Sequence, residues 1–173
     1  MTKTIIVFKP FDATLSRTGF DCGNEVLNRW FRDQAGQQER RNNVRTHLGL
    51  ATFDSRIASF FSLVAHEVQL EGGELSAFLA GRRYPVPALL IAQLAVDVRY
   101  QGRGVGRMTL AHALVLLAAT ATTVGFEAVV VDAIDEAAAS LYAGFGFEPL
   151  LEGGERMFLT TRDLLKNFAA RAG

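Results

Sequence analysis

A glycine-rich segment joins two long apolar stretches in the middle of the chain. It reads Gln101-Gly102-Arg103-Gly104-Val105-Gly106, and it lies between an apolar run over residues 88–97 and a helical pattern over residues 104–123. A strand that enters such a turn and continues as a helix is typical of phosphate sites, because backbone N–H groups and the helix N-terminus face the anion. Arg103 and Arg107 add positive charge beside the turn. By itself, the motif is equally compatible with a tight strand–helix turn that binds nothing.

A second motif, Leu141-Tyr142-Ala143-Gly144-Phe145-Gly146-Phe147, follows a short alanine-rich segment. Gly146 is placed to adopt the left-handed conformation that ends a helix, and a strand is expected to start at Phe147. This explanation does not account for Tyr142, which lies one turn before the helix end, where its hydroxyl can face a cleft. A half-buried aromatic with its hydroxyl in water is the alternative for Tyr142.

Together, the two motifs resemble the signatures of GNAT-fold acetyltransferases. The resemblance implies that the glycine turn binds the pyrophosphate of acetyl-CoA and that the edge of the strand before it pairs with the pantetheine amides. It also implies that Tyr142 is the general acid that protonates the departing CoA thiolate. The residues expected at the acetyl-CoA site are Leu94, Ala95, Val96, Gln101, Gly102, Arg103, Gly104, Val105, Gly106, Arg107, Asp132, Tyr142 and Phe145.

The remaining pattern predicts a single domain over residues 1–173, with no repeat or linker. Strands are predicted at residues 5–8, 47–53, 57–68, 88–97, 126–132, 147–150 and 157–159. Helices are predicted from residue 21 or 23 into a polar run at 34–43, and at 104–123, 136–145 and 164–170, with a loop and short helix over 71–83. Antiparallel strands come first and a β-α-β-α-β run follows. We therefore expect the α/β (α+β) class, in which helices flank a mixed, mostly antiparallel sheet of the GNAT fold.

Composition narrows the class of protein further. The 18 basic side chains balance 18 acidic ones, so the net charge does not indicate an anionic partner. The single cysteine, Cys22, excludes an internal disulfide and is typical of a reducing compartment. The apolar stretches are too short for a signal peptide or a membrane span, and the three histidines have no metal-ligand spacing. We expect a cytoplasmic protein without a metal or a membrane segment.

The acceptor is expected to be an amine that needs little help to lose its proton. Many GNAT relatives place a glutamate on the strand before the glycine turn, whereas this chain has Gln93 there and Asp97 beside the turn. An α-amino group titrates near about 8 and a lysine near about 10.4, so only the lysine strongly needs a dedicated base. The pattern favours an α-amino acceptor, and Glu67 is an alternative base.

Five arginines gather between residues 28 and 45 against two acidic side chains. A solvated helix face is the usual explanation for such a run. Contact with RNA phosphates is the alternative, because phosphate binding needs clustered basic side chains. The candidate tRNA surface consists of Arg29, Arg32, Arg40, Arg41, Arg45 and Gln93.

Further segments in the same order resemble the GNAT toxins of bacterial toxin–antitoxin modules. They are Phe20-Asp21-Cys22-Gly23, Leu27-Asn28, Phe60-Phe61-Ser62-Leu63, Val86-Pro87, Gln93-Leu94-Ala95-Val96-Asp97 and Val131-Asp132-Ala133. The resemblance implies an enzyme that acetylates the α-amino group of aminoacyl-tRNA, blocks translation, is neutralised by a ribbon-helix-helix antitoxin and forms a homodimer. These toxins commonly have arginine at the position of Gln93, so one charge of their tRNA surface is missing here.

Two other functions remain open at this point. One is an acetyltransferase for a small amine or a protein N-terminus. The other is a non-catalytic acetyl-CoA-binding module that acts through a partner.

Overall fold

The computed structural model describes residues 3–70 and 77–169. In this part of the chain seven strands form one sheet in the order β1-β2-β3-β4-β5-β7-β6. The pair β4–β5 is parallel, whereas β1–β2, β2–β3, β5–β7 and β6–β7 are antiparallel. The predicted mixed, mostly antiparallel sheet of an α/β (α+β) protein is therefore confirmed.

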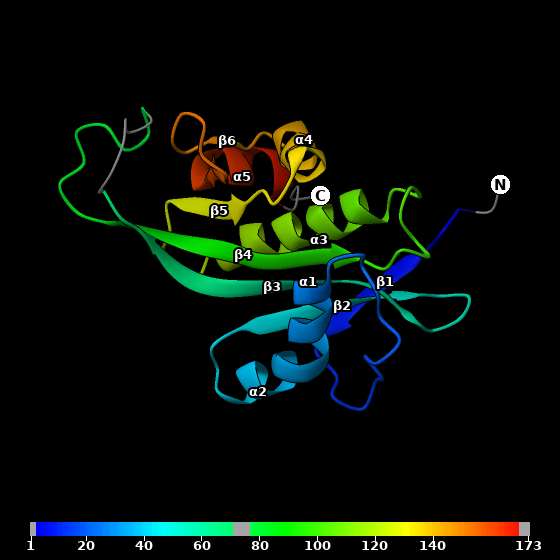
Figure 1. Ribbon diagram of the computed structural model, residues 1–173. Helices are drawn as coiled ribbons and strands as arrows, with labels where there is room; N and C mark the ends of the chain where they lie inside the picture. Colours follow the sequence, from blue (N-terminus) through cyan, green and yellow to red (C-terminus); the bar gives the residue numbers. More distant parts are fainter. Residues whose placement is uncertain (1–2, 71–76, 170–173) are drawn as a thin grey trace. The chain divides into compact units, whose positions relative to one another are not determined.

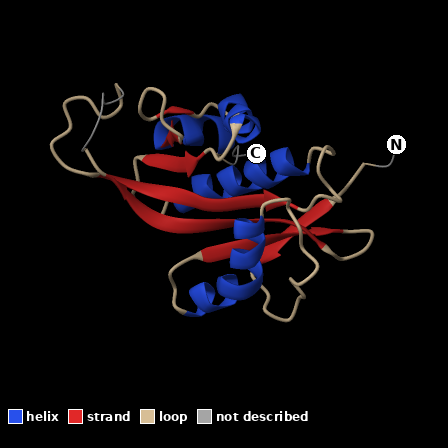
Figure 2. Ribbon diagram, in the orientation of Figure 1, coloured by secondary structure: helices blue, strands red, loops and turns tan. Residues whose placement is uncertain are grey.

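The elements are drawn in Figure 1 and coloured by type in Figure 2. The strands are β1 (Ile6–Pro10), β2 (Arg45–Ala51), β3 (Ile57–Val68), β4 (Val86–Val96), β5 (Ala128–Asp132), β6 (Glu148–Pro149) and β7 (Arg156–Thr160). The helices are α1 (Glu25–Arg29), the π-helix η1 (Trp30–Gln34), α2 (Ala35–Arg40), α3 (Val105–Thr120), α4 (Glu136–Gly144) and α5 (Thr161–Phe168).

The chain divides into two compact units, and each is described by itself. The first unit holds the described residues up to Val64 together with Ala92–Ala113. The second unit holds the described residues of Ala65–Ile91 and those from Leu114 onward. The single domain expected over residues 1–173 stays a prediction.

Aromatic side chains form the core of the first unit. Phe31 and Phe60 are fully buried and stack with their ring centroids 4.0 Å apart. Phe20 meets both rings edge-on, at 5.0 and 5.4 Å. Offset stacks and edge-to-face pairs are the favoured geometries of aromatic rings. Because Phe31 lies on η1 and Phe60 on β3, this cluster fastens the helical segment to the sheet.

The helical segment starts near the expected place but continues further than expected. Asn24 caps α1 by accepting a hydrogen bond from the N–H of Leu27 at 3.2 Å. The polar run from Gln34 predicts that the helix fades, yet the chain continues through η1 into α2. This prediction is wrong because α2 buries only Ala35 and Gly36, and such small residues leave no apolar periodicity to detect.

Prolines account for two differences at strand ends. Pro10 is expected to end the first strand but belongs to β1, where it pairs with His47. An edge strand tolerates proline because its outer N–H groups need no partner. β4 similarly begins at Val86 and includes Pro87, ahead of the expected residue 88.

The second unit is built on the buried strand β5. Val129, Val130 and Val131 are fully buried. β5 pairs in parallel with β4, from Ala88↔Ala128 to Ile91↔Val131, and antiparallel with β7. The predicted hairpin between β6 and β7 is confirmed.

Two predicted helix segments differ from the structure or lie beyond it. Residues 77–83 form turns without a helix, and residues 71–76 and 170 lie outside the described part.

Across the described ranges, no helix has the length and apolar character needed to cross a membrane.

Candidate functional site

The glycine turn connects β4 to α3 within the first unit. Gly102 and Gly104 have φ angles of +74° and +80°, left-handed values that glycine adopts without strain. A Cβ added to either glycine would meet nothing within 4 Å, so the space beside the turn is open. α3 begins directly after the turn, at the almost fully buried Val105. The first N–H groups of a helix have no hydrogen-bond partner within that helix. The turn therefore offers backbone donors and a positive helix end to an anion.

A buried carboxylate fixes the start of this turn. Asp97 is 0% exposed and accepts hydrogen bonds from Nε and Nη2 of Arg99, each at 2.9 Å. It also accepts from the N–H of Asp21 at 3.1 Å, and the Asp21 carbonyl accepts from the N–H of Val98 at 2.7 Å. Burial alone raises the pKa of Asp97, but these hydrogen bonds hold it below its usual value. Asp97 is thus an ionised structural group with its oxygens already engaged, and it is a poor candidate for the amine base.

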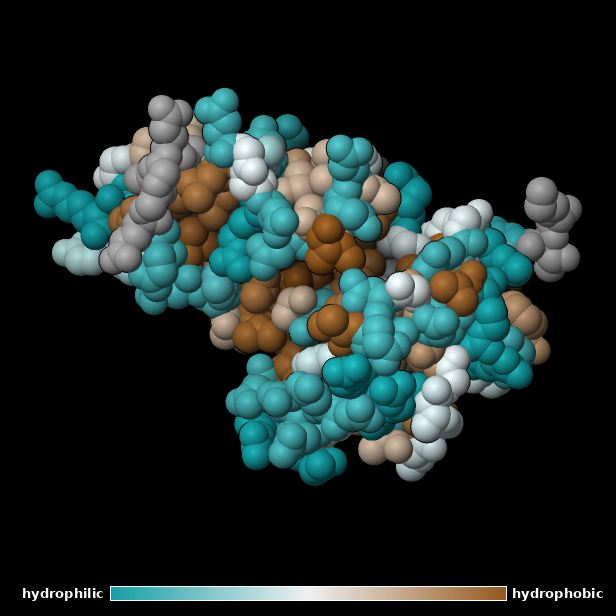
Figure 3. All heavy atoms as spheres, in the orientation of Figure 1, coloured by the Kyte–Doolittle hydropathy of each residue, from teal (hydrophilic) through white to brown (hydrophobic). Residues whose placement is uncertain are grey.

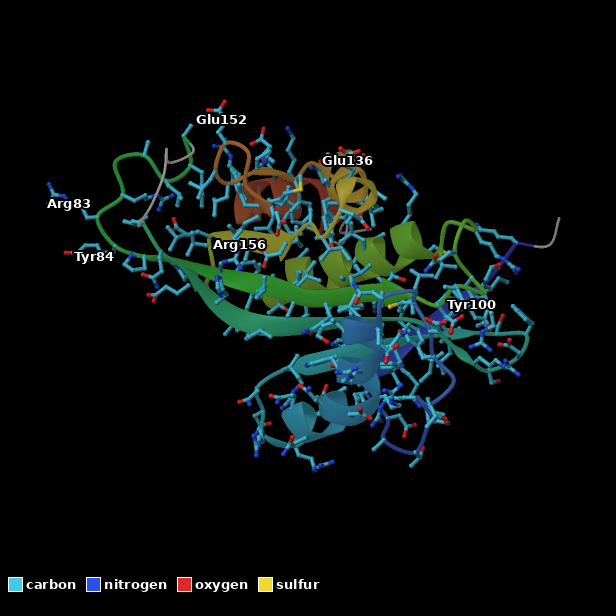
Figure 4. The ribbon with its side chains drawn as sticks, viewed as in Figure 1. Arg83, Tyr84, Tyr100, Glu136, Glu152 and Arg156 are labelled. Atoms are coloured by element: carbon cyan, nitrogen blue, oxygen red, sulfur yellow. The ribbon has the colours of Figure 1, made fainter. Side chains whose placement is uncertain are left out.

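The side chains of Gln101 and Tyr100 form hydrogen bonds that stabilise the same turn. Nε2 of Gln101 donates to the carbonyls of Cys22 at 3.0 Å and Val96 at 2.8 Å. The hydroxyl of Tyr100 (labelled in Figure 4) donates to Asp54 at 2.6 Å. Burial and this hydrogen bond raise the pKa of Tyr100 to about 12. The side chain of Gln101 thus holds the loop, which leaves anion binding to its backbone and to the residues that follow.

The other predicted residues of the first unit take distinct positions. Ala95 is 5% exposed and belongs to the aromatic core, whereas Leu94 and Val96 are half-buried. Arg103 is exposed and lines a hollow of about 330 Å³ with Lys3 and Phe53.

Tyr142 lies on α4 in the second unit, together with the expected residues Asp132 and Phe145. It is 6% exposed, and Phe147 packs beside it at 5.6 Å between ring centroids. Burial, followed by the charges of Asp132 and Asp135, raises the pKa of Tyr142 to about 12. The phenol therefore keeps its proton at neutral pH, as a general acid requires. Gly146 has φ of +98° and ends α4 in the predicted left-handed conformation.

Three side chains from separate strands meet at the end of β5, and the sequence predicts only one of them. Arg156 of β7 donates to Asp132 from Nε at 2.8 Å and from Nη2 at 2.9 Å. Its Nη1 lies 2.7 Å from Nε2 of His66 on β3 (Arg156 is labelled in Figure 4). The hydrogen bonds from Arg156 lower the pKa of Asp132, and burial lowers that of His66. The cross-strand register Asp132↔Arg156 creates this pair, and only knowledge of that register reveals it in the sequence.

The candidate tRNA surface is divided between paired and unpaired arginines. Hydrophilic side chains dominate the surface over α2 in Figure 3. Arg45 lies 3.1 Å from Glu39, and Arg32 lies 3.1 Å from Asp33. Within the described ranges, no ion pair involves the exposed Arg29, Arg40 and Arg41.

Gln93, the remaining residue of the candidate tRNA surface, lies on β4. Its Oε1 is buried and has no hydrogen-bond partner. Among the described residues, every other buried side-chain oxygen or nitrogen has a partner.

The structure thus gathers the glycine-turn residues and the arginines in the first unit, and Asp132, Tyr142 and Phe145 in the second. No group of three or more His, Cys, Asp and Glu side chains is placed to hold a metal ion in the described part of the chain.

Comparisons with known proteins agree with this description. The chain is 27% identical over 173 residues to a probable toxin TacT of Sinorhizobium fredii (strain NBRC 101917 / NGR234), covering 92% of this chain and 94% of that protein. It is 29% identical over 136 residues to a tRNA-acetylating toxin of Mycobacterium tuberculosis (strain ATCC 25618 / H37Rv), covering 76% and 77%. The crystal structure of a KacT mutant has the same fold, with a TM-score of 0.84 at 23% identity, covering 94% of this chain and 99% of that one.

A family match settles the classification. The acetyltransferase (GNAT) domain family matches residues 58–149, which is more than half of the chain and runs from β3 to β6. The predicted family is confirmed: the chain belongs to the GNAT acetyltransferases.

Proposed function

We propose that this protein transfers the acetyl group of acetyl-CoA to the α-amino group of aminoacyl-tRNA, and that it acts as a toxin by blocking translation. The observation that carries the acetyl-CoA part is the glycine turn, whose left-handed glycines open space at the start of α3. The names of the two curated relatives, a probable toxin and a tRNA-acetylating toxin, support the substrate class.

The described residues fit acetyl-CoA, which supplies the acetyl group as a thioester. The backbone N–H groups of residues 102–106 bind the pyrophosphate, and Arg103 and Arg107 add charge. The free edge of Leu94, Ala95 and Val96 pairs with the pantetheine amides. Asp132 and Phe145, which belong to the second unit, are further residues that we assign to acetyl-CoA binding.

Transfer then proceeds by direct attack. The amine nitrogen forms a bond to the thioester carbonyl carbon, the C–S bond breaks, and the amine loses a proton to water. Tyr142, which is protonated at neutral pH, donates its hydroxyl proton to the departing thiolate, and water then returns a proton to the phenolate. An α-amino group, with a pKa of about 8, is partly unprotonated near neutral pH, so the engaged carboxylate of Asp97 is not needed as a base.

The arginines of α1, η1, α2 and β2 contact the tRNA backbone. Arg29, Arg40 and Arg41 carry most of this contact, since Arg32 and Arg45 are partly neutralised by acidic neighbours. Gln93 of β4 contacts the acceptor end. The proposal also includes a ribbon-helix-helix antitoxin that neutralises the protein, and assembly of the protein as a homodimer. Its location is the cytoplasm, where charged tRNA occurs.

The test is to incubate the purified protein with radiolabelled acetyl-CoA and a pool of charged tRNAs, next to uncharged tRNA and free amino acids. Label on charged tRNA alone supports the proposal. Label on free amines instead favours a small-amine acetyltransferase, and bound acetyl-CoA without transfer to any amine favours a non-catalytic module.

The role of Tyr142 is tested separately. Tyr142→Phe removes the acidic proton but keeps the buried ring, so we expect acetyl-CoA to bind normally while kcat falls by about 10²-fold or more. Calorimetric titration with acetyl-CoA is the control for folding. Unchanged turnover in this variant would remove Tyr142 from the mechanism.

A further inference from the structure

Two arginines of the first unit meet over a glycine of α2. An ideal Cβ on Gly36 would lie 3.5 Å from Nη2 of Arg17 and 3.5 Å from Nη1 of Arg40. Both nitrogens are therefore close to one point in space, and they are separated by at most twice this distance. Arg17 is not one of the arginines that the sequence places on the tRNA surface, because it precedes the cluster by a dozen residues.

Arg17 is fixed in this position by the backbone and by an aromatic ring. Its Nε donates to the carbonyl of Phe31 at 2.9 Å, and its Nη2 donates to the carbonyl of Arg32 at 3.3 Å. The guanidinium lies 4.9 Å from the centroid of the Phe11 ring, within the range of a cation–π contact. Arg17 is thus held beside Arg40 despite their equal charge.

Carboxylates do not neutralise this pair in the described part of the chain. The acidic side chains of the surrounding segment are engaged with other bases: Asp12 with Lys9, Glu25 and Asp33 with Arg32, and Glu39 with Arg45. Burial lowers the pKa of Arg17, and the charge of Arg40 lowers it further. Two adjacent cations without an anion destabilise a fold unless a ligand completes the arrangement.

We propose that Arg17 and Arg40 form a phosphate-binding site, in which one anion bridges the two guanidinium groups next to Gly36. Guanidinium groups bind phosphate oxygens through charge-assisted hydrogen bonds in a planar, directed geometry. Within the proposed function, on which this step rests, the phosphate belongs to the backbone of the charged tRNA.

Inorganic phosphate tests the site without tRNA or acetyl-CoA. The melting temperature is measured against phosphate concentration at constant ionic strength, for the natural protein, Arg40→Gln, Gly36→Ala and the control Arg162→Gln. Arg162 is exposed on α5 and has no part in the proposed tRNA contact, so its variant is expected to respond like the natural protein. Arg40→Gln is expected to weaken phosphate binding about tenfold, because it removes a charge-assisted hydrogen bond.

Gly36→Ala separates a binding role from a charge role. The added Cβ would stand at ordinary contact distances, the third being 3.7 Å to Phe11, so the fold is kept and both charges stay. The methyl group would stand within 3.5 Å of both guanidinium groups and crowd an anion that bridges them, so we expect the phosphate response to fall although alanine favours the helix. An equal phosphate response in all four proteins would overturn the proposal.

Charged tRNA tests the source of the phosphate. The affinity is measured against salt concentration, and Arg40→Gln is expected to reduce the slope of log affinity against log salt by about 1. Arg162→Gln, exposed on α5, is the control for a change in net charge and is expected to leave the slope unchanged. An unchanged slope in Arg40→Gln would overturn the assignment to the RNA backbone. Failure of acetyl transfer to tRNA would overturn the proposed function alone, because the phosphate titration requires no transfer.

Discussion

Gln93 gives a prediction in which stability and activity change in opposite directions. Its Oε1 is buried and has no hydrogen-bond partner in the described part of the chain. An unsatisfied buried polar atom costs about 1–3 kcal/mol. Gln93→Leu removes that atom with little change of volume, so we expect the free energy of unfolding to rise by about 1–2 kcal/mol. For a chain of this length, the melting temperature should then rise by roughly 3–6 °C.

The matched control is Gln101→Leu. Gln101 carries the same side chain eight positions further on, but its Nε2 makes two hydrogen bonds, to the carbonyls of Cys22 and Val96. The loss of both should lower the free energy of unfolding by about 1–2 kcal/mol. Urea unfolding followed by the fluorescence of Trp30, which stacks near Phe60 in the core, measures both variants. If the two substitutions change stability in the same direction, the argument from hydrogen-bond satisfaction is refuted.

The activity of Gln93→Leu should fall while its stability rises. An acceptor atom without a partner, on the strand β4 that leads into the glycine turn, is suited to receive an N–H or O–H group of the acceptor end of the substrate. We expect a lower kcat/KM for charged tRNA and unchanged binding of acetyl-CoA. A stabilised variant with full activity would show that Gln93 has no role in substrate binding.

Two further predictions concern stability. His47 and His112 stack on Phe61 and Phe8, and burial lowers the pKa of both below the usual 6.5, so the unfolded chain binds more protons in acid. The free energy of unfolding should therefore be highest above about pH 6.5 and fall as the pH drops below it. His112→Gln should make this pH dependence weaker. The measurement is the midpoint of urea unfolding at pH values from about 7.5 to about 5.5. Gly49→Ala should destabilise the protein by about 1–3 kcal/mol, because its Cβ would collide with Ser59, whose hydroxyl accepts from Thr109 at 2.8 Å. The control is Gly125→Ala, where an added Cβ meets nothing within 4 Å. Equal melting temperatures of the two variants would contradict the steric argument.

Periodicity and turn chemistry predict much of this fold from the sequence. The strand expected at residues 57–68 coincides with β3, and the glycine expected to end a helix has the required positive φ at Gly146. Both signals are local, since an apolar run and a glycine act through their immediate neighbours. α2 is missed for the same reason, because Ala35 and Gly36 bury too little apolar surface to mark a helix face.

The parts that the sequence does not predict depend on contacts between distant positions. Arg156 meets Asp132 through strand register, and His66 joins them from β3. Arg17 reaches Arg40 because the carbonyls of η1 hold its guanidinium. Neither group has a spacing in the sequence that distinguishes it from ordinary surface charge.

The bonds around Asp97 have a consequence for engineering this enzyme. The segment before α1 is tied to the glycine turn three times: Asp21 bonds to Asp97 and to Val98, and the Cys22 carbonyl accepts from Gln101. The helical segment α1–α2, which carries the arginines, and the glycine turn therefore cannot be replaced independently of each other. All three bonds use backbone groups of residues 21 and 22, so their side chains can be exchanged as long as the chain follows the same path. A chimera that borrows α1–α2 from another acetyltransferase must therefore preserve the backbone path of residues 21–22 and keep the side chains of Asp97 and Gln101.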